Sequence, residues 1–322
     1  MAATPSMQPE KILKELAGLW GSMSKSEGNA GQGVNSGVLR ACAMTLIVAA
    51  ESEEDAMSAG EALGELMHEH PSRAIVLRPS TNPEDLGARV FAQCWMPFGK
   101  RQQICCEQIE ITASMERIAE AETTILGIMA PDLPMVLWVR GGHWLQSEGF
   151  ARLFPLAQKV VMDSSKCGNE EPFALIRRLQ PKVKLLGDLA WTRLTSLREI
   201  IAHTFQDASI VSKLGAIDKM IVEYTDHPIA ANYLAGWLSG AVSPSVQIEV
   251  RQKQGEFDTV QLTGEGLDIR IELGTTANFR INGLEYRTML PVPTEVSIMR
   301  EELSILRKDR VFEAALAAAE KL

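Results

Sequence analysis

The sequence predicts an α/β protein with a mostly parallel, helix-covered sheet first and an α+β region with an antiparallel sheet after it. Apolar runs alternate with helical segments up to about Pro181, whereas polar and apolar residues alternate strictly beyond Val246. A covered parallel sheet needs continuous apolar strands, and a half-exposed sheet needs alternation. Asn282-Gly283 between two alternating runs indicates a tight hairpin, because both residue types tolerate positive φ.

The sequence pattern of the N-terminal half predicts βα units. A continuous apolar run predicts a strand over 39–50, and Ser52 with the acidic residues after it resembles a capping box that opens a helix to about Met67. Further strands are expected at 74–77, 104–111, 135–139 and 159–162, and helices at 115–129 and 172–179.

The C-terminal half begins with helices and ends with helices. Ser196 and Glu199 form a capping box for a helix over 196–205, and a second helix is expected over 229–238. Alternating strands follow from Val246 onward, and the hairpin spans 279–290. Two closing helices are expected over 294–306 and 310–322, with an alanine-rich apolar face.

The N-terminal segment has a different composition. Residues 9–20 carry apolar side chains at helical spacing, and the glycine- and serine-rich segment Gly21 to Gly37 predicts a flexible linker. We therefore expect a tethered helix whose removal leaves the melting temperature nearly unchanged. The expected organisation is a helix and linker over 1–37, an α/β domain over 38–181 and an α+β domain over 182–322.

Charge and cysteine usage exclude several classes of partner and compartment. The 32 basic and 41 acidic residues give a formal net charge of −9, which repels nucleic acid and anionic membrane surfaces. No apolar run approaches the roughly 20 residues of a membrane span, and no secretory signal is visible. Five cysteines without a Cys-x-x-Cys pair predict reduced thiols and no disulfide framework, so we expect a cytoplasmic protein.

Catalytic motifs are missing from the sequence. It carries no P-loop, no Gly-x-Ser-x-Gly elbow and no cysteine with an evident histidine and asparagine. His68 and His70 lack the spacing of a zinc helix, so no metal is expected, and no cofactor or catalytic residue is assigned. Cys105 and Cys106 are either two structural residues of a strand or a thiol switch.

Three short segments hold polar residues, and each segment allows a functional and a structural interpretation. Ser72 and Arg73, after His70, could bind a phosphate or carboxylate, or the segment could end a helix and be followed by an ordinary ion pair. Arg140 follows a strand, at the sheet edge where ligands tend to bind, although the two glycines after it are equally typical of a turn. Asp188, Trp191 and Arg193 are either an interface hot spot or, for the tryptophan, part of a core.

Four strings together resemble the OpcA family, whose members are assembly and activation proteins for glucose-6-phosphate dehydrogenase. They are His70 to Leu77, Cys106 to Ile109, Leu133 to Trp138, and Gly187 to Leu194 continuing through Arg198-Glu199. The resemblance implies a non-catalytic protein that binds this dehydrogenase and promotes its active assembly in the oxidative pentose phosphate pathway. It carries no motif that sets the chain's own oligomeric state.

The candidate contact residues share a place in or beside these strings. They are His70, Ser72, Arg73, Glu107, Trp138, Arg140, Asp188, Trp191, Arg193 and Arg198.

The alternative function is a sugar-phosphate-binding enzyme or ligand sensor in which Arg73, Arg140 and Arg193 converge on a phosphate. One shared pocket beside a perturbed acid would favour that alternative, and dispersed arginines would favour the protein-binding activator.

Overall fold

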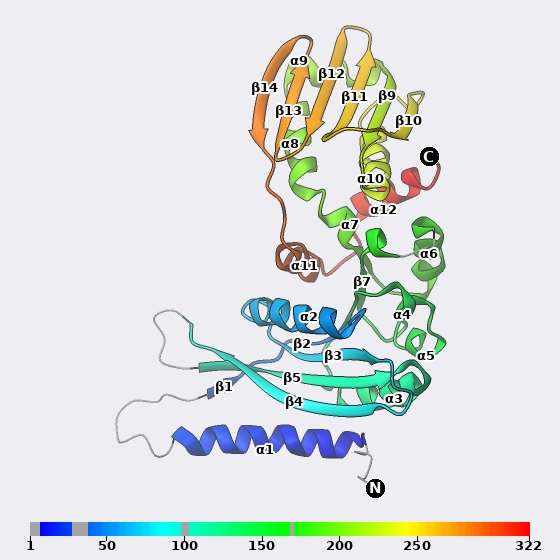
Figure 1. The fold of residues 1–322 in the computed structure, drawn as a ribbon. Coiled ribbons are helices and arrows are strands. Elements are labelled where there is room, and N and C mark those ends of the chain that lie inside the picture. The colour runs from blue at the N-terminus through cyan, green and yellow to red at the C-terminus, as the bar shows by residue number, and fades with distance from the viewer. Residues whose placement is uncertain (1–6, 28–37, 98–102, 168–170) are drawn as a thin grey trace. The chain divides into compact units, whose positions relative to one another are not determined.

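The computed structural model describes residues 7–27, 38–97, 103–167 and 171–322 of the 322. The chain divides into two compact units: residues 1–170 with 175–187, and residues 171–174 with 188–322. The first holds a mostly parallel sheet with helices, and the second holds a mixed sheet with helices before and after it (Figure 1). The predicted fold class is confirmed.

The sheet of the first unit has eight strands. They are β1 (Val38–Arg40), β2 (Met44–Ala49), β3 (Ser72–Ser80), β4 (Leu86–Trp95), β5 (Gln103–Ser114), β6 (Met135–Val139), β7 (Lys159–Met162) and β8 (Leu186–Asp188). The spatial order is β1-β5-β3-β2-β6-β7-β8, with β4 antiparallel along β5. From β5 to β8 this is a doubly wound order that reverses direction between β2 and β6.

The helices of this unit are α1 (Pro9–Glu27), α2 (Glu53–Leu66), α3 (Ile118–Ile128), α4 (Gly142–Gln146), α5 (Glu148–Ala151) and α6 (Pro172–Leu179), the last of which crosses the division between the units. The capping box at Ser52 is confirmed, because its side chain accepts a hydrogen bond from the Asp55 amide. β2 and β6 are buried along their whole length, as their continuous apolar sequences require.

The strand predictions need correction. The single strand expected over 39–50 is two strands, because the chain turns away after Arg40 so that β1 pairs with β5 while β2 lies between β3 and β6. β4, β8 and the strands Ile217–Tyr224 and Asp258–Gly264 of the second unit were not predicted. Most residues of β4 are only half-buried, and their sequence shows no clear alternation of polar and apolar side chains. β4 is therefore a strand because it pairs with β5, and its own sequence does not predict it.

The expectation of a tethered N-terminal helix was wrong. α1 continues through Gly21 to Glu27, and it packs against α3 and β4 (Figure 1). Ile12 and Leu16 are 4% and 2% exposed, and the Thr124 hydroxyl donates a hydrogen bond to the Met7 carbonyl. Burial of one apolar face stabilises the helix despite its glycines. The rest of the expected linker, residues 28–37, lies outside the described residues.

The second unit contains helices α7 (Leu189–Thr192), α8 (Thr195–Phe205), α9 (Ala208–Val211), α10 (Pro228–Ser239), α11 (Glu295–Ser304) and α12 (Arg310–Ala319). The capping box predicted at Ser196 is wrong, because α8 begins one residue earlier and Leu194 at its N-cap makes no side-chain hydrogen bond. Its strands are β9 (Ile217–Tyr224), β10 (Gln247–Gln252), β11 (Asp258–Gly264), β12 (Leu267–Leu273), β13 (Thr276–Ile281) and β14 (Leu284–Met289). The order is β10-β9-β11-β12-β13-β14, in which only β10 and β9 pair in parallel.

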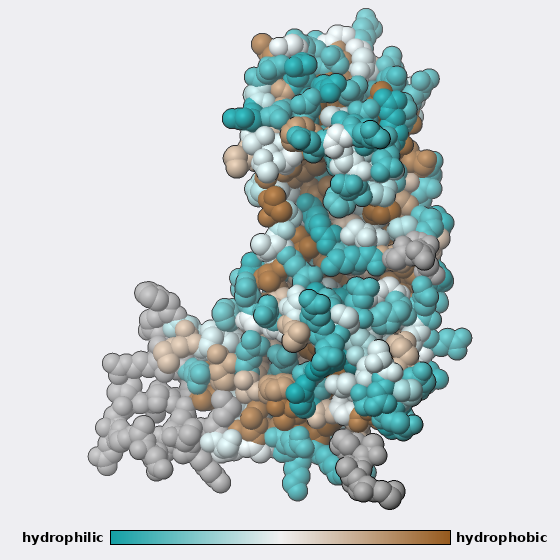
Figure 2. All heavy atoms as spheres, in the orientation of Figure 1, coloured by the Kyte–Doolittle hydropathy of each residue, from teal (hydrophilic) through white to brown (hydrophobic). Residues whose placement is uncertain are grey.

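The sheet of the second unit has one apolar and one polar face, as the alternation predicts. Val260, Ile269 and Phe279 are at most 1% exposed, whereas their sequence neighbours carry hydroxyls and charges. Figure 2 shows mostly hydrophilic residues on the surface over these strands. The hairpin is also confirmed: Asn282 and Gly283 have φ of 48° and 85° between β13 and β14.

The docking of α1 predicts unequal effects for two leucines on the same helix. Leu16→Ala should lower the free energy of unfolding by about 2–5 kcal/mol, because it empties a buried site. Leu13→Ala, at a position that is 37% exposed, should cost well under half as much and controls for helix propensity. Urea unfolding of both variants measures this, and equal small losses would show that α1 is not docked.

Candidate functional site

A buried carboxylate at Glu107 joins four elements of the first unit. Its oxygens lie 2.6 Å from Arg73 Nε and 2.6 Å from Arg40 Nη2, and one accepts a 2.7 Å hydrogen bond from Trp20 Nε1. Arg73 also donates to the Ile128 carbonyl at 2.6 Å. The parallel register places Arg73 directly beside Glu107, so β3 and β5 position the central pair, and β1 and α1 supply the other two donors.

A second ion pair occupies the place where the sheet changes winding direction. Arg140, just after β6, donates to both oxygens of Asp55 in the first turn of α2, at 2.6–2.9 Å. Its guanidinium carbon lies 4.6 Å from the centre of the Trp138 ring. Burial alone would raise the pKa of Asp55, but hydrogen bonds from Arg140 and the Glu51 amide hold it below its ordinary value.

This ion pair bears on anion binding. In doubly wound sheets, phosphates bind at this switch point against the amino end of a helix, usually through a glycine-rich turn. Here the first turn of α2 carries Glu53, Glu54 and Asp55, and Ser52 caps it. An incoming phosphate would meet three carboxylates, of which Arg140 holds Asp55 and Arg78 holds Glu53. The geometry disfavours a nucleotide phosphate at this position.

Two of the three arginines that the ligand-binding alternative requires lie at opposite ends of the sheet. Arg73 and Met135 both pair with Thr45 of β2, and Arg140 lies five residues beyond Met135. At about 3.3 Å per residue, this separates Arg73 and Arg140 by roughly 17 Å along the strands. They do not form one phosphate site. Arg193 belongs to the second unit, where it is half-buried.

The fourth of the strings that resemble the OpcA family lies, from Asp188 onward, in the interior of the second unit. Asp188 is fully buried, caps α7 through the Ala190 amide and accepts a 2.6 Å hydrogen bond from the Tyr233 hydroxyl. Trp191 is 3% exposed and packs against Tyr233 and Phe312. The Arg198 guanidinium stacks on Trp191, with its carbon 3.6 Å from the ring centre.

Charged groups of α8 and α11 surround this cluster. Burial lowers the pKa of Arg198, although the charges of Asp309 and Glu301 oppose that shift, and burial raises the pKa of Glu301. Glu302, 2% exposed, accepts a hydrogen bond from the Thr192 hydroxyl. The cluster is therefore a hydrogen-bonded network that fixes α7 and α8 to α10, α11 and α12.

Burial separates the candidate residues into two groups. The half-buried residues are His70, Arg193 and Arg198. The buried residues are Ser72, Arg73, Glu107, Trp138, Arg140, Asp188 and Trp191. For the buried group, the contacts favour a structural role over direct contact with a partner, and such contact stays a prediction. Sequence reasoning did not select Asp55, Arg40 or Trp20. Only the acidic run after Ser52 gave a signal, and it was read as helix capping alone.

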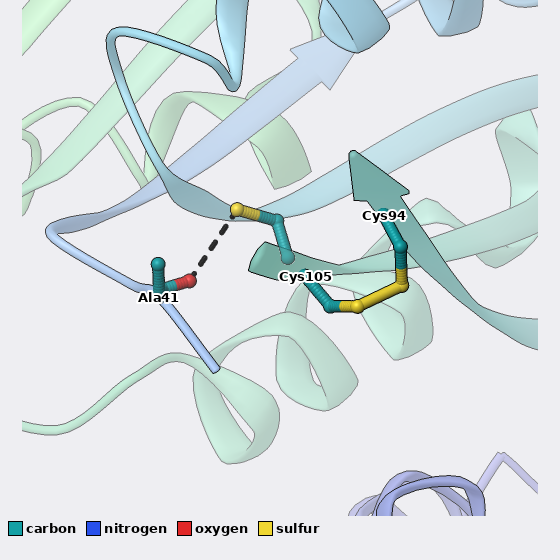
Figure 3. Close-up of a disulfide and its surroundings, with 4 residues drawn as sticks. Ala41, Cys94 and Cys105 are labelled. Atoms are coloured by element: carbon teal, nitrogen blue, oxygen red, sulfur yellow. Dashed lines mark hydrogen bonds between the residues drawn. A yellow bond between two sulfur atoms is a disulfide. The ribbon is translucent and has the colours of Figure 1, made fainter. Parts of the chain in front are cut away.

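The expectation of reduced thiols was wrong for one pair. Cys94 and Cys105 form a disulfide with a Cα–Cα distance of 4.1 Å, and they are register partners in the antiparallel pair of β4 and β5 (Figure 3). The unpredicted β4 is the reason the pair was not recognised. Cys106 is buried and free, with its sulfur 3.4 Å from the Ala41 carbonyl oxygen. Burial raises the pKa of its thiol to about 11, which disfavours a reactive thiolate.

The described residues contain neither a cluster of metal-binding side chains nor a helix that could span a membrane. Among them, no group of three or more histidine, cysteine, aspartate or glutamate side chains is placed to hold a metal ion. None of the helices described is both long and apolar enough to cross a membrane.

The two carboxylates of β5 provide a test of the Glu107 cluster. Glu107→Gln should lower the free energy of unfolding by about 3–5 kcal/mol, because it leaves buried Arg73 without a counter-charge. Glu110→Gln, which disturbs more exposed pairs with Arg78 and Arg89, should cost about 1 kcal/mol or less. Denaturant unfolding compares them, and equal losses would contradict a special role for Glu107.

The disulfide has a separate test. Cys94→Ala should lower the free energy of unfolding by about 2–4 kcal/mol, and it should abolish the response to reductant that the unmodified chain shows. Cys106→Ala should keep that response, because its thiol is free. Thermal unfolding with and without dithiothreitol measures both effects. A wild-type chain that is indifferent to reductant would contradict the disulfide.

The chain is similar to several known proteins. Curated relatives named OxPP cycle protein OpcA share 30% identity in Synechocystis sp., over 53% of this chain and 37% of the relative, and 26% in Nostoc punctiforme, over 62% and 43%. The chain thus aligns with less than half the length of these relatives. A Gfo/Idh/MocA family oxidoreductase structure from Vibrio cholerae matches 86% of this chain and 95% of its own, at 8% identity and a TM-score of 0.45, which is too weak to inform fold or function.

Family models give the strongest match. Residues 64–180 match the N-terminal domain, and residues 184–316 the C-terminal domain, of the family described as glucose-6-phosphate dehydrogenase subunit, OpcA. These models cover most of both units, in the order of the family's own domains. The chain belongs to the OpcA family.

Proposed function

We propose that the chain is a non-catalytic protein that binds glucose-6-phosphate dehydrogenase and promotes its active assembly in the oxidative pentose phosphate pathway. The observation that carries the proposal is the match of both units to the two domains of a family described as a subunit of that enzyme. The names of the curated relatives refer to the same cycle. The chain spans less than half the length of these relatives, so a shared role with them is part of this proposal.

The switch point of the first unit supports a non-catalytic role. A doubly wound sheet offers a nucleotide site there, but Arg140 and Asp55 neutralise each other, and two more carboxylates face the same end of α2. Arg73 is likewise held by Glu107. Two of the three arginines that could bind a sugar phosphate, Arg73 and Arg140, are thus engaged within the fold, and we assign the chain no cofactor.

The proposed compartment is the cytoplasm, with no nucleic acid or membrane as partner. The formal net charge of −9 supports the exclusion of both partners, since it repels phosphate backbones and anionic lipid headgroups. The compartment is proposed from the partnership with the dehydrogenase alone, because the Cys94–Cys105 disulfide removes the argument from reduced thiols. Activation then needs only modest contacts. A partner that prefers one assembly state by about 1.4 kcal/mol shifts the assembly equilibrium tenfold.

A titration tests the proposal. The purified full chain is added to glucose-6-phosphate dehydrogenase from the same cell, and the rate of NADP⁺ reduction is followed together with oligomer mass. We expect the rate to rise saturably as a heavier assembly accumulates, and we expect the chain alone to turn over no glucose 6-phosphate. An unchanged rate and mass, or turnover without the dehydrogenase, would contradict the proposal.

A charge reversal sharpens the titration. Arg193→Glu should reduce the activation more than Arg307→Glu does, because Arg193 belongs to the string that carries the family resemblance, whereas Arg307 is an exposed residue outside it. Both variants change the charge equally, and thermal unfolding checks that each is folded. Equal activation by the two variants would remove Arg193 from the proposed contact.

A further inference from the structure

The outer edge of β14 is open for pairing with another strand. β14 pairs with β13 on one side, and no other described strand adjoins it; it ends the sheet (Figure 1). The hairpin register fixes which main-chain groups face outward. Ile281 and Leu284 close the two-residue turn, and the Leu290 amide bonds to the Thr275 carbonyl at the other end. The alternate residues Glu285, Arg287 and Met289 therefore direct their amides and carbonyls away from β13.

Edge strands are often protected by proline, by a bulge or by charged side chains, above all lysine; β14 has no proline, lysine or bulge, and its two charges are of opposite sign. Instead it exposes large apolar side chains: Leu284 is 77% and Met289 is 72% exposed. Tyr286 stacks on Phe279 at 4.7 Å and donates a hydrogen bond to the Thr204 hydroxyl, which holds this strand firmly in place. The edge is thus ordered, apolar and unpaired within the described chain.

The charges on β14 are complementary to those of a second copy. Glu285 and Arg287 are two residues apart, so their side chains share one face of the strand. When two copies run antiparallel about a two-fold axis at Tyr286, each Glu285 lies opposite Arg287 of the other copy. The two outward-facing residues then form hydrogen-bonded pairs, with about four main-chain bonds. Tyr286 meets its equivalent on the opposite face.

Neighbouring registers are unfavourable. If the two-fold axis passes through Glu285, the two Glu285 side chains lie opposite each other, and if it passes through Arg287, the two Arg287 side chains do. Like charges directly opposite destabilise a sheet. Only the Tyr286-centred register opposes both unlike pairs. Glu285 Oε1 already holds Arg280 Nη2 at 2.6 Å, and the second oxygen of the carboxylate can accept the guanidinium of another copy. No ion pair of Arg287 occurs among the described residues.

The opposite edge of the same sheet differs. β10 also carries a glutamate and an arginine two residues apart, Glu249 and Arg251. Arg251, however, donates to Glu249 and to Glu223 of β9, so its charge is satisfied within the chain. The apolar residues of β10, Ile248 and Val250, are half-buried, in contrast to exposed Leu284.

We propose that β14 pairs antiparallel with β14 of a second copy of this chain, in the register that opposes Glu285 and Arg287, and joins two six-stranded sheets into one. The contact is small, so the dimer should form at micromolar concentrations and weaken as salt screens its charges. This proposal concerns the chain alone and is independent of the proposed function.

Sedimentation equilibrium of the purified full chain tests the proposal, at increasing concentration and at low and high salt. Arg287→Glu places four carboxylates along the shared edge and should raise the dissociation constant of the dimer about tenfold. Glu285→Lys should do the same. An equimolar mixture of the two variants should recover the wild-type affinity, because each then opposes unlike charges on the other.

Arg251→Glu is the matched control on β10, and it should leave the dimer unchanged. A wild-type chain that stays monomeric at all concentrations overturns the proposal, as does a dimer that Arg251→Glu weakens and Arg287→Glu does not. If the chain is monomeric and Arg287→Glu reduces binding to the dehydrogenase, the edge serves that enzyme, and the self-pairing is wrong. Failure to recover affinity in the mixture also contradicts the register. Thermal unfolding confirms that each variant is folded.

Discussion

The buried carboxylate of Glu107 is the constraint on which the arrangement of the first unit depends. A charge that is 2% exposed is stable only when it is paired and hydrogen-bonded, and its three partners come from α1, β1 and β3. The same group therefore sets the position of Arg73 and holds Trp20 in place. One buried charge therefore links the N-terminal helix, which the burial of Ile12 and Leu16 also stabilises, to strands that are already paired through their main chains.

The switch point shows how a fold can be kept while a ligand site is filled. The order of the parallel strands brings the ends of β2 and β6 together, which in many proteins creates a phosphate site. In this chain, Asp55 and Arg140 occupy that place, and the first helical turn is acidic. Function follows from the residues at the site and not from the topology, so the fold alone assigns no activity.

The sequence predicts features that depend on local patterns. Continuous apolar runs located β2, β6 and β7, and Asn282-Gly283 located the hairpin, because each depends on neighbouring residues. β4, its disulfide and the Arg73–Glu107 pair depend on strand pairing between residues that are distant in the chain, which no local pattern records. α1 was misjudged because the glycines at and after Gly21 suggested a linker, while the stabilising contacts lie on α3 and β4.

The buried charges of Glu107, Arg73 and Arg140 are engaged within the fold, and we propose that the chain acts by binding another protein. Purification of the full chain from its own cells, followed by native mass spectrometry of the complexes, tests this proposal most directly. We expect glucose-6-phosphate dehydrogenase in a fixed molar ratio to the chain. A folded chain recovered without the dehydrogenase, or carrying a stoichiometric nucleotide or sugar phosphate instead, would contradict it.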